Sequence, residues 1–143
     1  MREILFRGKR TDNDEWIKGY LHKTDGVGKG YRAFAIQVQD IDSYMCRPHS
    51  HEVQPKTVGQ FTGLTDKNGK KIFEGDIVKF HTETYTSESD TIGKIEYFNG
   101  TFGISYKNGK HFLEFINMSM YVRWYEVIGN IHDNPELLEK DNV

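Results

Sequence analysis

Turn signals recur along the chain at short intervals, and this spacing constrains the fold more than any other feature of the sequence. Three of them are Asn-Gly pairs, at positions 68–69, 99–100 and 108–109. Asn and Gly adopt the positive φ angles of a tight hairpin turn at little steric cost, so an Asn-Gly pair between apolar runs predicts a hairpin. Closely spaced turns are typical of many short strands rather than of alternating strands and long helices. The chain is therefore predicted to be mainly β.

The apolar pattern between the turns predicts the individual strands, at residues 15–21, 34–38, 92–98, 101–107, 110–116 and 121–131. The strands from 92 to 116 form an antiparallel meander in which Phe102, Ile104 and Tyr106 share one face, and this face is expected to be core. The last strand is rich in β-branched and aromatic residues and is expected to be interrupted near Gly129.

Two other segments have a different pattern. A short helical turn is expected at the C-terminal end, where Asp133 or Asn134 can cap it, Pro135 suits its first position and Glu136 favours the positive end of its dipole. The segment 81–91 has one aromatic and no aliphatic side chain to bury, so a mobile or protruding loop is expected there.

Composition limits the class of protein. The chain has 143 residues, 36% of them hydrophobic, which suits one ordinary domain. Its 19 basic and 21 acidic residues give a net charge of −2, which provides no global positive field for nucleic acid or an anionic membrane. Cys46 is the only cysteine, so no disulfide forms within the chain. With no apolar run long enough for a signal or a membrane span, a cytoplasmic protein is expected.

The segment 62–80 is the most informative stretch. Glycine turns flank Ile72 and Phe73, and a strand then begins at Ile77 and Val78. A Gly-Asp-Ile-Val sequence of this kind is typical of small SH3-like barrels, where the glycine allows a tight turn and the aspartate accepts hydrogen bonds from turn amides. The residues of this structural motif are Gly63, Asn68, Gly69, Gly75 and Asp76.

The chain resembles the YopX family, small proteins commonly encoded by phages and prophages of Gram-positive bacteria. The resemblance lies in residues 2–10, 15–20, 55–64, 74–78 and 126–138. It implies one domain over 1–143 in a bacterial host cell, and it implies no reaction and no cofactor. We expect N-terminal strands in 1–56, an SH3-like barrel in 57–131 and an acidic tail in 132–143.

Three patterns could carry chemistry, and each has a plainer interpretation. Cys46, His49 and His51 are possible zinc ligands, but a fourth ligand is missing, so an exposed polar loop without metal is expected. The glycines of 26–30 lack the Ser or Thr and the helix of a phosphate-binding loop, and predict a hairpin connection. Glu74 and Asp76 could divide acid and base roles in a small hydrolase, but beside Gly75 they fit turn hydrogen bonds better.

Nucleic-acid binding is the stronger alternative. Small β-barrels often place aromatic rings beside lysines, so that bases stack while the lysines meet phosphates. The residues that could form such a surface are Lys67, Lys70, Lys71, Phe73 and Lys79, with Phe61 nearby. The near-neutral charge favours a core role for the aromatics and a solvated hairpin for the lysines.

The sequence thus predicts a non-enzymatic phage or prophage accessory protein that binds another macromolecule, protein rather than nucleic acid, without a cofactor or a membrane. A homo-oligomer is compatible with this fold, because edge strands in a small open sheet invite pairing. The partner, the oligomeric state and the stage of the phage cycle are not fixed by the sequence.

Overall fold

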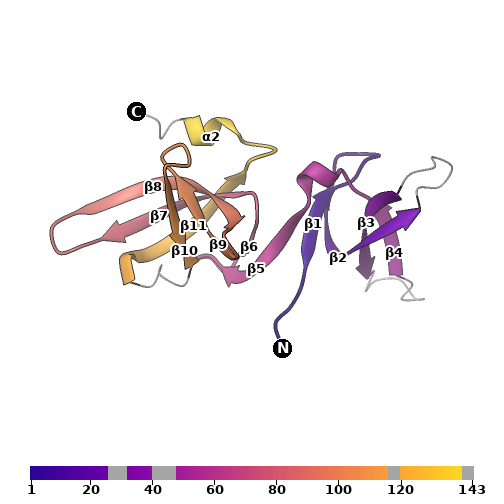
Figure 1. Ribbon diagram of the computed structural model, residues 1–143, viewed down its shortest axis with the longest axis horizontal. Coiled ribbons are helices and arrows are strands. Elements are labelled where there is room, and N and C mark those ends of the chain that lie inside the picture. The colour runs from indigo at the N-terminus through magenta and orange to yellow at the C-terminus, as the bar shows by residue number, and fades with distance from the viewer. Residues whose placement is uncertain (26–31, 40–47, 116–119, 140–143) are drawn as a thin grey trace. The chain divides into compact units, whose positions relative to one another are not determined.

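The computed structural model describes residues 1–25, 32–39, 48–115 and 120–139. The chain divides into two compact units, Met1–Phe61 and Thr62–Val143. In Figure 1 the first unit is coloured indigo to magenta, and the second runs on to yellow. The expected subdivision at 56/57 falls a few residues before this division, and the single domain over 1–143 stays a prediction.

The N-terminal unit is an antiparallel sheet. Its elements are β1 (Phe6–Lys9), β2 (Trp16–Asp25), β3 (Arg32–Gln39), β4 (Pro48–Glu52), the 3₁₀ turn η1 (Pro55–Thr57) and β5 (Gly59–Thr65), which continues into the second unit. The chain after β4 returns to β1, where Arg10 bridges Val53 and the Gln54 amide donates to the Lys9 carbonyl at 2.8 Å. The buried apolar residues of this unit include Ala35, Ile36 and Val53.

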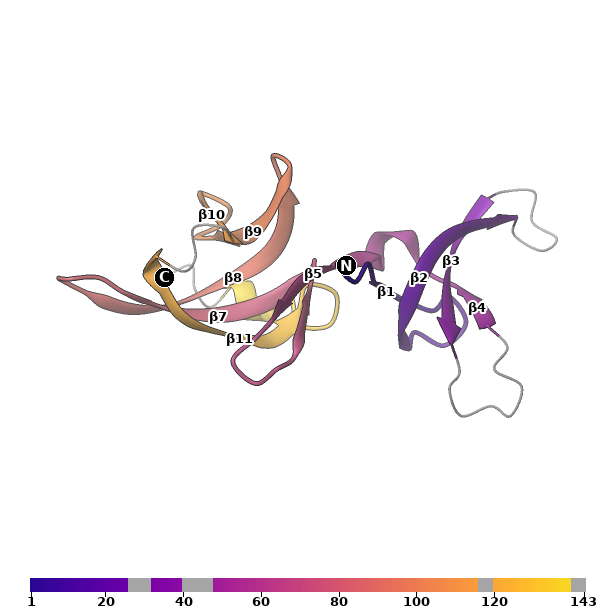
Figure 2. The ribbon, with the colours of Figure 1, turned by 90° about the horizontal axis from the view of Figure 1, so that it is seen from below.

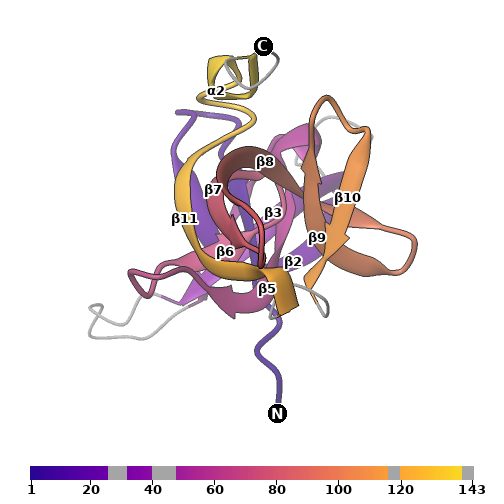
Figure 3. The same ribbon diagram turned by 90° about the vertical axis from the view of Figure 1, so that its left-hand side faces the viewer.

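The C-terminal unit contains a five-stranded antiparallel sheet with the order β10-β9-β8-β7-β11. Its elements are β6 (Lys71–Phe73), β7 (Asp76–Glu83), β8 (Glu88–Phe98), β9 (Thr101–Tyr106), β10 (His111–Glu114), β11 (Val122–Asn130) and the short helix α2 (Glu136–Glu139). Figure 3 looks onto this unit and shows β8 curving between β7 and β9. The core consists of Val78, Phe80, Ile95, Ile104 and Val122 on one face of the sheet, together with Ile72 of β6.

Most of the predicted β structure is confirmed. The meander corresponds to β8, β9 and β10, and Asn99 and Gly100 have the positive φ angles of 51° and 84° expected between paired Phe98 and Thr101. In the predicted core face, Ile104 is fully buried and Tyr106 packs against the core, while Phe102 is half-buried. The register of β11 shifts before Gly129, and the C-terminal helix forms.

The described strands form no closed barrel, so the SH3-like part of the prediction is not confirmed. The five-stranded sheet is open, with β10 at one edge and β11 at the other. The edge of β11 is partly covered by the turn after β5, because the Lys67 amide donates to the Tyr125 carbonyl at 3.0 Å and Asp66 Oδ2 accepts from the Val127 amide at 3.0 Å. The carboxylate of Asp66 thus accepts a hydrogen bond from the edge of β11 that the backbone of a further strand could otherwise accept.

The loop prediction for 81–91 is wrong in its secondary structure. β7 continues to Glu83 and β8 begins at Glu88, which is its cross-strand partner. Polar pairs replace the missing apolar ones: His81 Nδ1 lies 2.7 Å from Asp90 Oδ1, and the hydroxyls of Thr82 and Ser89 lie 3.0 Å apart. The segment does protrude, as a long paired hairpin (Figure 2).

Candidate functional site

The face of the five-stranded sheet that lies opposite its core, here called the outer face, carries the candidate site. Side chains alternate along a strand, so when Ile95 of β8 points into the core, Lys94 and Glu96 point the other way. On the neighbouring strands, Ser105 is paired with Lys94 and Phe112 is paired with Ser105. These residues therefore line up across β8, β9 and β10 on the same face.

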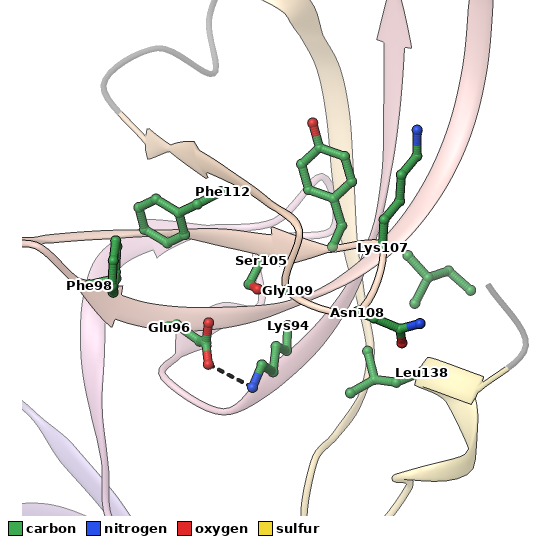
Figure 4. Close-up of a pocket in the computed structure, with 11 residues that line it drawn as sticks. Lys94, Glu96, Phe98, Ser105, Lys107, Asn108, Gly109, Phe112 and Leu138 are labelled. Atoms are coloured by element: carbon green, nitrogen blue, oxygen red, sulfur yellow. Dashed lines mark ion pairs between the residues drawn. The ribbon is translucent and has the colours of Figure 1, made fainter. Parts of the chain in front are cut away.

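A groove of about 390 Å³ lies on this face, between β8, the turn that follows β9, and α2. Figure 4 shows Phe98 and Phe112 at one end, and Lys107, Asn108 and Leu138 at the other. Pockets of 300 Å³ and more, on the usual scale of about 300–1,000 Å³, accept a small molecule or a few side chains of a partner.

The first end of the groove is aromatic. Phe98 is 60% exposed, and its ring meets that of Phe112 edge to face, with the centroids 5.4 Å apart. The ring of Phe112 has room only because residue 103 is glycine, since a Cβ there would lie 2.5 Å from Phe112 Cζ. The fold therefore holds one ring in place and leaves its neighbour open to a partner.

The middle of the groove is polar and close to neutral. Lys94 Nζ and Glu96 Oε1 form an ion pair at 2.6 Å, drawn as a dashed line in Figure 4. Ser105, which is buried, adds a hydroxyl to the lining. Ion-paired side chains on one strand face can hydrogen-bond a partner without adding net charge.

The second end of the groove is cationic. Lys107, Asn108 and Gly109 form the turn between β9 and β10, with φ angles of 51°, 57° and 75°. Lys107 and Lys110 are exposed, and no ion pair involves either of them within the described part of the chain. The groove thus joins an aromatic end to an uncompensated positive end, an arrangement that suits binding.

The predicted lysine cluster is placed differently. Lys67 Nζ lies 2.9 Å from Glu126 Oε2, whose pKa this hydrogen bond lowers, and 4.2 Å from the centre of the Trp124 ring. Lys79 Nζ lies 3.3 Å from Asp90 Oδ2. Two of the predicted cations therefore already have carboxylate partners.

The predicted aromatic residues are not at the surface. Phe73 is 1% exposed and Phe61 is also buried, so neither ring can stack on a base from its place in the structure. Lys70 is exposed and Lys71 is half-buried. The ring beside Lys67 is Trp124, which sequence reasoning did not single out as a site residue. Nor did it single out Phe98, Phe112 and Lys107, although the alternation along β8 carries a signal for Phe98.

The residues of the structural motif make turn contacts. Asp76 is 1% exposed, and its Oδ2 accepts from the Phe73 amide at 2.8 Å. Gly63, Gly69 and Gly75 have φ angles of 89°, 80° and 85°. The carboxylate of Asp76 is thus held by backbone rather than presented to a substrate, while Glu74 beside it is half-buried.

Asp66 is the centre of the turn that contains Asn68 and Gly69. Its Oδ1 accepts from the amides of Asn68 at 2.8 Å and Lys70 at 2.9 Å. Burial pushes the pKa of Asp66 upward, but hydrogen bonds from the Val127, Lys70 and Asn68 amides outweigh it and hold the pKa below its ordinary value. The carboxylate therefore stays ionised and fixes the turn.

The remaining candidates fall partly outside the described residues. Cys46 and the glycines of 26–30 lie there, so the predictions for a metal site and for a phosphate loop stay predictions. His49 and His51 lie on β4. Within residues 1–25, 32–39, 48–115 and 120–139, no group of three or more His, Cys, Asp or Glu side chains could hold a metal ion, and no helix has the length and apolar character needed to cross a membrane.

Comparison with known proteins identifies the family. No curated protein matches the chain. The crystal structure of protein EF1440 from Enterococcus faecalis is similar, with 25% sequence identity, a TM-score of 0.55, and coverage of 96% of this chain and 99% of that one. A family model described as YopX protein matches residues 5–139, which cover most of both compact units. The chain therefore belongs to the YopX family.

Proposed function

We propose that this protein is a non-enzymatic accessory protein of a phage or prophage, which acts in the bacterial cytoplasm by binding another protein in the groove of the outer face. The observation that carries the proposal is the pair Phe98 and Phe112, one exposed and one held in place, at the end of a groove of about 390 Å³. Partly exposed aromatic rings in preformed hollows are typical of the residues that dominate protein interfaces.

Membership of the YopX family supports the context. It points to a phage-type protein of unknown role, and the family is not a known enzyme family. The groove is consistent with this, because its two oppositely charged side chains, Lys94 and Glu96, form an ion pair with each other. A catalytic site instead needs a nucleophile or base with a group that orients it.

The charges favour protein over nucleic acid as the partner. Lys67, Lys79 and Lys94 each have a carboxylate within ion-pair distance, and the whole chain carries −2. Binding to phosphates gains its free energy largely from released counterions, and a lysine that already has a carboxylate partner contributes little of it. A protein partner needs no such excess of positive charge.

The test compares three forms of the protein. Wild type, Phe98→Ala and the control Tyr20→Ala, whose ring is 63% exposed on β2 of the other unit, are cross-linked in induced cells. The captured protein is then purified and titrated by calorimetry. We expect wild type and Tyr20→Ala to bind equally, and Phe98→Ala to bind about tenfold more weakly or worse, as for an interface hot spot.

Two results contradict the proposal. Phe98→Ala could bind the captured protein as tightly as wild type does. Alternatively, a labelled oligonucleotide could bind wild type with a steep dependence on salt while no protein binds, which would replace protein with nucleic acid as the partner.

A further inference from the structure

We infer that the partner of the groove is a second copy of this chain, whose β7–β8 hairpin tip inserts Tyr85 between the aromatic and the cationic ends of the groove. The inference rests on the proposed function, because it names the protein that the groove binds. It assigns a role to the protruding segment 81–91, which the sequence alone leaves without one.

The hairpin tip presents an aromatic side chain on a firm turn. Tyr85 is 109% exposed, more than in an extended reference peptide. The turn beneath it is closed by the Thr84 amide, which donates to the Ser87 carbonyl at 2.8 Å, and by the Thr84 and Ser87 hydroxyls, which lie 3.0 Å apart. Because the turn already fixes the backbone, covering the ring costs mainly the entropy of its own side-chain torsions.

The base of the tip adds further apolar surface. Tyr85 lies beside a hollow that Met120 and Tyr121 also line, and both of these side chains are exposed. Three large exposed side chains in one place are typical of a surface that another protein covers.

The charges of the two surfaces are complementary. The segment 81–91 contains three carboxylates and neither Lys nor Arg. Glu83 is paired with Arg123 at 2.8 Å and Asp90 with Lys79 and His81, whereas Glu88 is exposed and has no ion pair among the described residues. The turn at the second end of the groove offers the reverse: Lys107, which lines the groove, and Lys110 after it, with no acidic residue in this turn. Glu88 can therefore face these lysines when Tyr85 meets Phe98.

The tip cannot reach the aromatic end of the groove in its own chain. Glu88 and Phe98 are the two ends of β8, a strand of 11 residues, which spans roughly 33 Å at about 3.3 Å per residue. The tip of the β7–β8 hairpin projects away from the rest of the sheet, as Figure 2 shows. A contact between different patches of two copies leaves one free tip and one free groove, so copies add head to tail.

The test mixes two defective variants. Tyr85→Ala has an intact groove, and Phe98→Ala has an intact tip; both side chains are exposed, so both variants are expected to fold. In sedimentation velocity we expect wild type and the Tyr20→Ala control to grow beyond dimers with concentration. Each variant alone stays monomeric, and an equal mixture of Tyr85→Ala and Phe98→Ala forms a one-to-one heterodimer that grows no further.

A charge exchange tests the orientation of the contact. Glu88→Lys is expected to weaken self-association about tenfold, and mixing it with Lys107→Glu/Lys110→Glu is expected to recover most of this loss in low salt. The inference is overturned if wild type stays monomeric at high micromolar concentration, or if wild type associates but the mixture of Tyr85→Ala and Phe98→Ala does not.

These results separate the inference from the proposed function. A monomeric wild type that still binds a captured protein, and loses it with Phe98→Ala, contradicts the inference and leaves the proposed function standing. Self-association that Phe98→Ala leaves intact contradicts the groove itself.

Discussion

Two turns of this protein have the same sequence, Lys-Asn-Gly-Lys, at 67–70 and at 107–110, and they fold differently. In the first turn, only Gly69 has a positive φ angle. In the second, Lys107, Asn108 and Gly109 all do. The lysines differ as well, because Lys67 is paired with Glu126 and stacked on Trp124, while the lysines of the second turn have no ion pair in the described part of the chain.

The residue before each turn explains the difference. Asp66 precedes the first turn, and its carboxylate accepts from the Asn68 and Lys70 amides, which holds Lys67 and Asn68 in a right-handed turn. Tyr106 precedes the second turn, and its ring instead packs edge to face on Phe80, with the centroids 5.4 Å apart. One side-chain acceptor therefore decides whether the same four residues become a fixed turn or an open rim of the groove.

The largest expected effect is that of removing this acceptor. Asp66→Ala leaves three amides without their partner, and we expect the free energy of unfolding to fall by about 2–3 kcal/mol, the cost of buried unsatisfied donors. Urea denaturation of Asp66→Ala and wild type measures this loss in the free energy of unfolding. Asp66→Asn, which keeps one carbonyl oxygen, should lie between Asp66→Ala and wild type. A loss below about 0.5 kcal/mol for Asp66→Ala would show that the turn does not depend on its carboxylate.

A smaller effect of the same carboxylate appears with pH. The folded-state pKa of Asp66 lies below its unfolded value of about 3.9, so its contribution is fully present above that unfolded value. It is lost as the pH falls through the lower folded pKa, because the unfolded chain then binds the proton more readily. We expect the stability of Asp66→Asn to decline less steeply than that of wild type below about pH 4, in denaturation midpoints measured at successive pH values. Equal slopes would contradict this.

Replacing the first lysine of each turn with glycine should affect the free energy of unfolding differently in the two turns. Lys67→Gly loses the contacts with Glu126 and Trp124 and adds unfolded-state entropy, so we expect a loss of about 1 kcal/mol. Lys107→Gly relieves a left-handed φ of 51°, worth about 1–2 kcal/mol, against a similar entropy cost, and we expect no loss or a small gain. Thermal denaturation of Lys67→Gly and Lys107→Gly measures both changes in stability. Equal losses would mean that the two backbones are alike.

The smallest effect is expected at the end of the second turn. Lys110 is exposed, so Lys110→Ala should change the free energy of unfolding by less than about 0.5 kcal/mol. A loss above 1 kcal/mol would reveal a structural role for this lysine.

The strands follow from local sequence where the local signals are strong. Asn99-Gly100 fixes the β8–β9 hairpin, and Gly129 marks the shift in β11. The hairpin of 81–91 was missed because polar pairs such as His81 with Asp90 form only once the two strands are aligned. Hydrophobic periodicity carries no signal for such pairs.

The candidate site could be predicted less well than the fold, because its contacts join distant parts of the chain. Nothing near Lys67 in the sequence indicates that Glu126 neutralises it. Similarly, Phe98 and Phe112 meet only through the register of β8, β9 and β10, and through the space at Gly103. Long-range register decides which charges and rings stay available, and a single sequence does not display it.

The short helix α2 forms one side of the groove through Leu138. α2 has four residues, too few to be helical alone, and it rests on Gly129, where a Cβ would lie 2.6 Å from Asn134 Oδ1 and 2.9 Å from Leu137 Cδ1. At its start, the Leu137 amide donates to the Asn134 carbonyl at 3.1 Å and the Leu138 amide donates to the Pro135 carbonyl at 3.2 Å. We expect such a turn to open more often than the sheet, so that its amides exchange with solvent through local openings while those of Ile95 and Ile104 exchange only on global unfolding. Because Leu138 lines the groove, we expect fraying of this one helical turn to widen the groove on that side without any opening of the sheet.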